Sequence, residues 1–252
     1  MSWVLLRGLA REARHWGEFT QQIASIDPQA GSKQRVALDL PGNGKFFEQA
    51  SPRSVHAMVD FARGQLLAQG FKPPYRLLAM SLGAMVATDW AQRCPHEVAR
   101  LVLINTSMRP HSRISERLHP GNWLRLALLA ARWPDAGYAE RVIHQQTCNN
   151  IAARDDDLAA WVRIRTSAPV SAVNAWRQLW AAARFSCATE PPRCPTLVLS
   201  SARDQLVHPR CSVRLAQAWR AAHQQHPWAG HDLPHDDADW VCRRVADWLG
   251  GA

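Results

Sequence analysis

The junction between residues 75–80 and 81–87 constrains the fold of this chain more than any other segment. Residues 75–80, Tyr-Arg-Leu-Leu-Ala-Met, are an apolar run typical of a buried strand, and the sequence after Ser81 is typical of the start of a helix. Ala79 and Gly83 stand two residues before and two residues after Ser81. A serine on a sharp strand-to-helix turn needs small residues at both positions, because larger side chains would collide across the turn. The pattern predicts either an outward-facing nucleophile or a turn kept small for packing alone.

Two later segments carry an acid and a base just after predicted strands. Asp204 follows the predicted strand 196–200 in a loop of small residues, and His231 follows Gly230, which permits a tight turn. Together with Ser81 they stand in the order Ser, Asp, His, and all three fall at the same edge of a parallel sheet. We therefore expect His231 to accept the proton of Ser81 and Asp204 to fix the tautomer of His231.

Each of these assignments has a structural alternative. Asp204 could instead cap a helix that starts near Pro209. His231 is one of 11 histidines, and His208, His226 and His235 lie close to it in the sequence. The chain order and the position at strand ends favour the catalytic interpretation.

The chain resembles the α/β-hydrolase superfamily over nearly its whole length. Besides Ser81, Asp204 and His231, residues 36–44 read Val-Ala-Leu-Asp-Leu-Pro-Gly-Asn-Gly, which is similar to the D-L-P-G-x-G signature of that superfamily. Some relatives place the acid after the strand that ends here near Ile104, but the next three residues are Asn, Thr and Ser. The resemblance therefore leaves Asp204 as the acid.

The resemblance also implies an oxyanion hole. By position, its donors are the backbone N–H groups of Leu9 and Leu82. Ala79 stands where the superfamily more commonly has glycine, which is sterically harmless. Arg7 stands where it usually has histidine, and this exchange brings a positive charge close to the site.

Alternation of strands and helices predicts an α/β fold with a mostly parallel sheet of about six strands and helices on both faces. The predicted strands are 3–7, 35–40, 75–80, 101–104, 196–200 and roughly 223–228. The predicted helices of this core are 16–25, 54–69, 82–93, 212–221 and 238–249. We expect no counterpart of the extra hairpin with which the superfamily normally opens.

Residues 107–188 interrupt the alternation. Helical patterns cover residues 123–133, 138–149, 156–165 and 171–184. The superfamily inserts its cap at this place, so we expect a core of residues 1–106 and 189–252 and a helical cap of residues 107–188. Five tryptophans of the cap either pack inside it or line the pocket, and packing is the commoner role; they are Trp123, Trp133, Trp161, Trp176 and Trp180.

Composition agrees with one α/β domain that carries an insertion. The chain has 252 residues of which 47% are hydrophobic, without an apolar run long enough to cross a bilayer and without a signal-peptide pattern. The six cysteines form no C-x-x-C pair and are typical of reduced thiols in a cytoplasmic protein, although Cys187 and Cys194 are close enough to form a bridge. We expect a cytoplasmic protein that is not bound to a membrane.

The net charge of +9 comes mainly from arginines dispersed along the chain. Without a lysine-rich run or a recognised module, it does not predict nucleic-acid binding. Arg7, Arg11 and Arg14 could instead favour an anionic substrate. Residues 231–236 lack a familiar metal spacing, and we expect Asp236, Asp237 and Asp239 to cap the last helix instead. Residues 41–44 lack the partners of a nucleotide-binding loop, so we expect no metal and no cofactor.

The expected function is that of a serine hydrolase that cleaves a small-to-medium carboxylic ester or thioester through an acyl-enzyme. Carbon–carbon bond hydrolysis, lactone opening and acyl transfer use the same three residues and remain alternatives. A member of the fold that binds a small ligand without turnover is a further alternative, which the complete set of Ser81, Asp204 and His231 disfavours. The sequence leaves the oligomeric state open.

Overall fold

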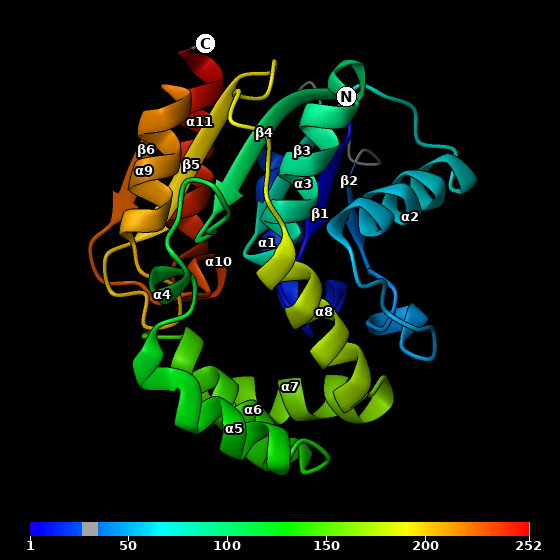
Figure 1. Ribbon diagram of the computed structural model, residues 1–252, viewed down its shortest axis with the longest axis vertical. Helices are drawn as coiled ribbons and strands as arrows, with labels where there is room; N and C mark the ends of the chain where they lie inside the picture. The colour runs from blue at the N-terminus through cyan, green and yellow to red at the C-terminus, as the bar shows by residue number, and fades with distance from the viewer. Residues whose placement is uncertain (27–34, 252) are drawn as a thin grey trace.

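The computed structural model describes residues 1–26 and 35–251, and within them the central element is a six-stranded parallel sheet (Figure 1). The strands lie in the order β2-β1-β3-β4-β5-β6. Their bounds are Trp3–Leu6 (β1), Arg35–Leu38 (β2), Tyr75–Met80 (β3), Val98–Ile104 (β4), Thr196–Ser201 (β5) and Ala222–His226 (β6). The predicted fold class and number of strands are confirmed, while β4 starts earlier and β6 ends earlier than the sequence pattern indicated.

Successive side chains of each strand point to opposite faces of the sheet, and both faces are covered. In β3, Leu77 packs against one layer of helices and Leu78 against the other. The first layer contains α2 (Val55–Ala68), α3 (Leu82–Arg93) and α9 (Arg210–Trp219). The second contains α1 (Phe19–Ser25) and α11 (Ala238–Gly250). All four residues of β1 are buried, as expected for a strand inside a parallel sheet.

Side chains at the helix starts decide where several helices begin. Ser54 accepts a hydrogen bond from the Ala57 N–H at the start of α2, and Asp237 accepts one from the Trp240 N–H at the start of α11. Asp236 was expected to cap α11 as well, but it ends the short helix α10 (Leu233–Asp236). Its carboxylate instead accepts hydrogen bonds from backbone N–H groups of other segments, so this part of the prediction was wrong.

Residues 107–188 form a helical segment, and α5 to α8 lie together beyond the ends toward which the strand arrows point (Figure 1). Its helices are α4 (Ile114–Arg117), α5 (Trp123–Ala131), α6 (Ala136–Thr147), α7 (Arg154–Ser167) and α8 (Ala172–Arg184). The only extended pairing found among these residues is a single bridge from Arg109 to Ser186. α4 and α10 were not predicted, because helices of four residues are too short for periodicity to detect.

The five tryptophans of the helical segment do not share one environment. Trp133 and Trp161 are buried, in agreement with a packing role. Trp123, Trp176 and Trp180 are 58%, 62% and 44% exposed, so internal packing was the wrong expectation for them. They stand on α5 and α8, whose outer faces present further apolar side chains to solvent.

All six cysteines are free thiols, and Cys187 and Cys194 are not bridged. None of the helices in residues 1–26 and 35–251 combines the length and the apolar character that crossing a membrane requires.

Candidate active site

Ser81 lies on a strained turn between β3 and α3. Its φ of 53° and ψ of −119° fall in a region that residues with a side chain rarely adopt. The Ser81 N–H donates to the Ile104 carbonyl at 3.0 Å, which fixes the turn to the end of β4. A Cβ atom at Gly83 would lie 2.4 Å from the Leu6 carbonyl oxygen, so only glycine lets α3 approach β1 this closely. The need for a small residue at position 83 is therefore a matter of backbone contact.

At the start of α3, the N–H group next to the serine has no acceptor within the helix. The N–H groups of Ala84 and Met85 already donate to the Ser81 carbonyl, whereas the Leu82 N–H precedes the first turn and has no acceptor within the helix. Leu9 approaches from the other side, because a Cβ atom at its neighbour Gly8 would lie 3.2 Å from the Ser81 Cβ. Leu9, Ser81 and Leu82 line one pocket.

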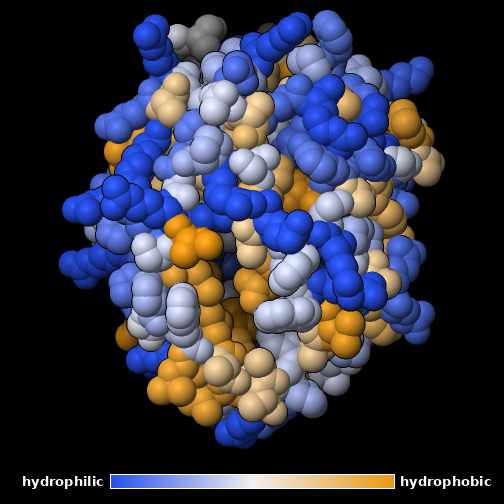
Figure 2. Space-filling model, in the orientation of Figure 1, coloured by the Kyte–Doolittle hydropathy of each residue, from blue (hydrophilic) through white to orange (hydrophobic). Residues whose placement is uncertain are grey.

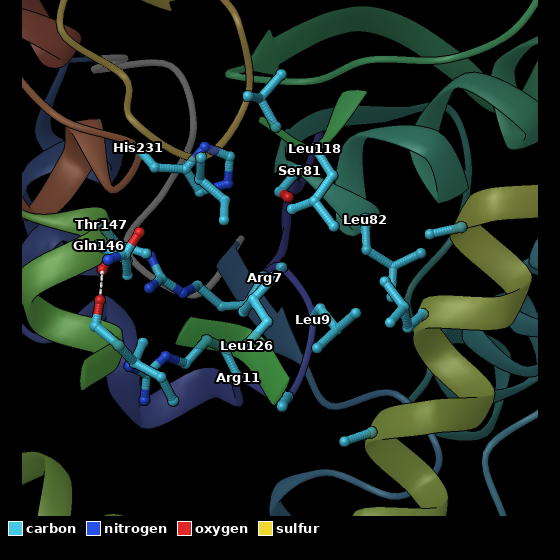
Figure 3. Close-up of a pocket in the computed structure, with 18 of the residues that line it drawn as sticks. Arg7, Leu9, Arg11, Ser81, Leu82, Leu118, Leu126, Gln146, Thr147 and His231 are labelled. Atoms are coloured by element: carbon cyan, nitrogen blue, oxygen red, sulfur yellow. Dashed lines mark hydrogen bonds between the residues drawn. The ribbon is translucent and has the colours of Figure 1, made fainter. Parts of the chain in front are cut away.

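His231 and Asp204 come together as the sequence predicted. The His231 Nδ1 lies 2.7 Å from the Asp204 Oδ2, and their side chains are only 4% and 2% exposed. The other Asp204 oxygen accepts hydrogen bonds from the N–H groups of Leu206 and Val207. Since Nδ1 faces the carboxylate, Nε2 is the nitrogen left for the pocket, and Figure 3 shows the His231 ring turned toward Ser81.

Opposing influences act on the protonation of His231. Burial lowers its pKa, but the charge and the hydrogen bond of Asp204, aided by the charge of Asp232, raise it more strongly. The pKa of His231 therefore lies above the ordinary value of 6.5. A histidine tuned in this way is a stronger base than one in water.

None of the three neighbouring histidines lines the described pocket. His226 pairs with Asp237, and His235 pairs with Asp157. The His208 ring accepts a hydrogen bond from the Arg210 N–H. His231 is thus the histidine that the fold brings to Ser81.

Asn105 directly follows β4, the position at which some relatives carry the catalytic acid. Its side chain connects the end of β4 to the end of β5 and to the loop that carries His231. Its side-chain amide nitrogen lies 2.8 Å from the His231 carbonyl, 3.2 Å from the Gly230 carbonyl and 2.9 Å from the Ser201 hydroxyl, so its two N–H groups are shared among three acceptors. Its carbonyl oxygen accepts from the Ser201 N–H. Sequence reasoning noted only that this position lacks an acid, and missed that an amide can hold the His231 loop by both donating and accepting.

Arg7 forms a buried bidentate pair with Asp232. The Arg7 guanidinium donates at 3.0 and 2.5 Å to the two Asp232 oxygens, and the two side chains are 2% and 4% exposed. Burial would raise the pKa of Asp232, but the charge and hydrogen bonds of Arg7 lower it to about 2. The charge that Arg7 brings to the site is therefore compensated inside the protein, and the sequence analysis did not foresee its partner.

The next two arginines are also paired. Arg11 donates to Glu140 at 2.5 Å and lies over the Trp161 ring, and Arg14 is bound to Glu12. These internal partners remove much of the reason for expecting Arg7, Arg11 and Arg14 to hold an anionic substrate.

Gln178 is a further residue that sequence reasoning missed. Its side-chain oxygen accepts from the Ala10 N–H at 2.8 Å, and its amide donates to the Asn43 and Ser51 side chains. Gln178 is fully buried on α8, so it joins the helical segment to the backbone next to Leu9. The sequence did offer a sign of this role, because a glutamine on the inner face of a predicted helix needs a polar partner once it is buried.

The pocket has a polar end near the serine and an apolar end between α5 and α8. Its volume is about 310 Å³. In Figure 3, Arg7, Arg11, Gln146 and Thr147 lie on one side of Ser81. The apolar end is lined by Leu126, Leu129, Ala130, Trp133, Ala172, Ala175, Trp176, Leu179 and Ala182. Figure 2 shows a hollow in the lower half of the molecule with hydrophobic side chains on both flanks.

Comparisons with known proteins agree with this architecture. The family model described as serine aminopeptidase, S33, matches residues 8–236. Over 260 aligned residues the chain is 31% identical to the "Putative carbamate hydrolase RutD" of Klebsiella pneumoniae strain 342, which covers 98% of this chain and 90% of that protein.

Two further similarities are more limited, one in its length and the other in its sequence identity. A pimeloyl-[acyl-carrier protein] methyl ester esterase of Chromobacterium violaceum is 37% identical over 95 residues, which are 37% of this chain and 35% of that protein. The crystal structure of the enol-lactonase from Burkholderia xenovorans LB400 superposes with a TM-score of 0.78 at 18% identity, covering 99% of this chain and 91% of that chain. The latter likeness establishes the fold alone.

Proposed function

The chain belongs to the serine aminopeptidase, S33, family of α/β-hydrolases, and from this premise we propose that it is a serine hydrolase that cleaves a small-to-medium carboxylic ester or thioester. The observation that carries the proposal is the buried Asp204–His231 pair, with the free side of the imidazole turned toward Ser81 in one pocket (Figure 3). Hydrolase activity follows from the family, whereas the ester or thioester substrate is the proposed part.

In the proposed mechanism, the Ser81 Oγ attacks the substrate carbonyl carbon while His231 Nε2 accepts the hydroxyl proton. Asp204 holds the Nδ1 proton and stabilises the imidazolium that forms. The N–H groups of Leu9 and Leu82 would donate to the carbonyl oxygen as it becomes negatively charged.

The attack gives a tetrahedral intermediate. When this intermediate collapses, the bond to the alcohol or thiol breaks, and the leaving group takes the proton from His231 and departs, leaving an ester of Ser81. Water then repeats the sequence with His231 as the base. Water attacks the acyl carbon while His231 accepts one of its protons. The bond from the acyl carbon to the Ser81 Oγ then breaks, His231 gives the proton to Ser81, and the carboxylic acid is released. Each turn thus consumes one water and leaves the three residues unchanged.

The helical segment 107–188 acts in this proposal as a cap that sets acyl length. A volume of about 310 Å³ lies at the small end of the roughly 300–1,000 Å³ that ligand pockets occupy. The apolar side chains of α5 and α8 would surround an acyl chain whose carbonyl lies at Ser81.

A carbamate is the second candidate, because the relative that matches over almost the full length carries that activity in its name. A small carbamate offers little apolar surface to the end of the pocket formed by Leu126, Leu129 and Leu179. The apolar lining therefore favours the acyl ester.

Labelling with a fluorophosphonate, followed by p-nitrophenyl esters of increasing acyl length and a matched p-nitrophenyl carbamate, tests the proposal. We expect one label per chain on Ser81, turnover of short-to-medium esters and loss of essentially all turnover in Ser81→Ala. A Ser107→Ala variant, which changes another serine of the same pocket, should still take up the label. Near-parental turnover by Ser81→Ala would overturn the assignment, and a preference for the carbamate would replace the ester.

A further inference from the structure

A second group of polar side chains lies where the helical segment meets the core, away from the Asp204–His231 pair. His144 lies in the last turn of α6 and Cys148 caps that helix, while His235 belongs to α10. The four-residue spacing of the first two places them on one helix face, and the Cys148 N–H donates to the His144 carbonyl at 2.8 Å. One possible ligand atom from each of His144, Cys148 and His235 lies within 4.8 Å of the others.

Asp157, in the first turn of α7, adds an oxygen to this group. Its Oδ2 lies 3.1 Å from the His235 Nε2 and 3.5 Å from the His144 Nε2. Four ligands around a tetrahedral ion at bond lengths of roughly 2.0–2.3 Å are separated from each other by about 3.3–3.8 Å. The distances from Asp157 to the two histidines are close to these separations. The ligand atoms of His144, Cys148 and His235, which lie within 4.8 Å of one another, would have to move closer by about 1 Å to bind an ion.

His144 supplies an independent sign that a ligand is missing from the arrangement. Its side chain is 1% exposed, and its Nε2 forms no hydrogen bond with any residue in the described parts of the chain. The Asp157 Oδ2 lies within ion-pair distance of it, but 3.5 Å is longer than a normal hydrogen bond. A buried ring nitrogen that lacks a hydrogen bond is uncommon in folded proteins and costs free energy. The side chains of Asp157 and His235 are each 20% exposed, which gives an ion a path from solvent.

We propose that His144, Cys148, Asp157 and His235 bind a divalent transition-metal ion of the zinc class. Two imidazole nitrogens, a thiolate and a carboxylate oxygen are a donor set suited to Zn²⁺, whereas Mg²⁺ and Ca²⁺ prefer oxygen ligands throughout. All four ligands of the ion would come from the protein. None of them belongs to the proposed hydrolytic site, in which His231 pairs with Asp204.

The ion would link α6, α7 and α10, which are separate elements of the chain. α6 and α7 belong to the helical segment, and α10 follows directly after the His231 loop. Thr147, between the two α6 ligands, lines the pocket, and its carbonyl accepts the Asp232 N–H at 2.7 Å. Metal binding would thus hold the proposed cap against the loop that carries His231.

The alternative is a metal-free cluster held by packing. The Trp161 ring lies 5.3 Å from the His144 ring and 5.1 Å from the His235 ring, so aromatic contacts alone could account for their proximity. Packing leaves the His144 Nε2 with only the 3.5 Å contact to Asp157 and without a hydrogen bond, which is why the metal site is preferred.

Co²⁺ titration of the full chain, after removal of metals with a chelator, tests the site. We expect one Co²⁺ per chain, a thiolate-to-cobalt charge-transfer band in the near ultraviolet, displacement by one equivalent of Zn²⁺ and a higher Tm with Zn²⁺. Cys148→Ser should lose the band, and Asp157→Asn and His235→Gln should each weaken binding by at least roughly 10-fold, the loss seen even for outer partners of metal sites.

Cys194→Ser and His56→Gln change the same residue types outside the group and should bind Co²⁺ like the parent chain. Circular dichroism and Tm of every chelated variant establish that it is folded. The proposal is overturned if the parent shows no charge-transfer band, if the band persists in Cys148→Ser, or if the controls lose it equally. Because these are binding measurements, they stand or fall separately from ester hydrolysis.

Discussion

Arg7 and Asp232 bind each other through two hydrogen bonds, at 3.0 and 2.5 Å, in the interior between two segments that flank Ser81. Arg7 directly follows β1 and precedes the Gly8–Leu9 turn, while Asp232 directly follows His231. One ion pair therefore fixes the distance between the proposed oxyanion donor at Leu9 and the proposed base. Its contribution is to position these groups, since neither charge is free to meet a substrate.

Removing one partner of this pair should be much more harmful than removing both. In Arg7→Met the Asp232 carboxylate stays buried without compensation, and we expect a loss of about 3–5 kcal/mol in the free energy of unfolding. The double variant Arg7→Met, Asp232→Leu should recover much of that loss. Urea denaturation of the parent, both single variants and the double variant measures the coupling free energy between Arg7 and Asp232. Additive effects of the two substitutions would show that the two residues do not stabilise each other.

The pH dependence of turnover should report the raised pKa of His231. As the base must be neutral, kcat/KM should fall as pH drops through the pKa of His231, with a midpoint above 6.5. Asp204→Asn removes the charge that raises this pKa, so the midpoint should move to lower pH while turnover falls by about 10⁴-fold.

A pH profile of kcat/KM for the parent and for Asp204→Asn checks both effects. Asp60→Asn, a change to a more exposed carboxylate, serves as the control and should leave the profile unchanged. A midpoint that stays in place in Asp204→Asn would contradict the assigned role of Asp204.

Asn105 should act on the reaction through the position of His231. Asn105→Asp loses the amide donors to the carbonyls of Gly230 and His231 and sets a carboxylate against them. A small displacement of a catalytic group can cost about 10²-fold, so we expect kcat to fall by that order with little change in KM.

Asn105→Gly is the matched variant, because it removes the same hydrogen bonds while tolerating the positive φ of 45° at this position. Both variants should lower kcat. If Asn105→Gly kept the parental kcat, the hydrogen bonds to the His231 loop would have no positioning role.

The elements that the sequence predicted well are those encoded by local pattern. Largely apolar runs of four to seven residues between helical patterns place β1 to β5, whereas the polar β6 was placed by its position between two helical patterns. The parallel connection rule then brings Ser81, Asp204 and His231 to one edge. Gly83 could be singled out from the strand-turn-helix pattern around Ser81, although its size limit comes from the Leu6 carbonyl of β1 and not from the turn itself.

Features that the sequence did not predict depend on pairs of side chains distant in the chain. Arg7 with Asp232, and Gln178 with Ala10, are separated by 225 and 168 residues, and no periodicity relates such positions. The exposed Trp176 was misjudged because an apolar helix face can meet either a core or the mouth of a pocket. Asp236 was misjudged because several adjacent acids could cap α11 equally well.

Gly83 and Gly64 form a matched pair of glycines in helices. A methyl group at Gly83 would lie 2.4 Å from the Leu6 carbonyl, whereas one at Gly64 in α2 would meet nothing within 4 Å. Gly83→Ala should therefore destabilise the protein by about 1–3 kcal/mol and lower turnover by displacing the Ser81 turn. Gly64→Ala should stabilise it by about 0.5–1 kcal/mol. Thermal unfolding and ester turnover of both variants give the comparison, and equal behaviour would show that the α3–β1 contact is not limiting.

The arginines of the pocket determine whether the charge of a substrate affects its turnover. Arg7 and Arg11 line the pocket but are bound to Asp232 and Glu140. The third lining arginine, Arg117, donates to the carbonyls of Ala182 and Ala183 near the end of α8, where the helix dipole favours a positive charge.

With these partners in place, an anionic ester should gain no advantage over a neutral one. We expect kcat/KM for a carboxylate-bearing ester to be equal to or lower than that of a matched neutral ester, at both low and high salt. Charge attraction would instead appear as a preference for the carboxylate that weakens as salt is added. If that preference were found, its loss in Arg117→Gln but not in Arg14→Gln would assign it to the one pocket arginine that no carboxylate neutralises.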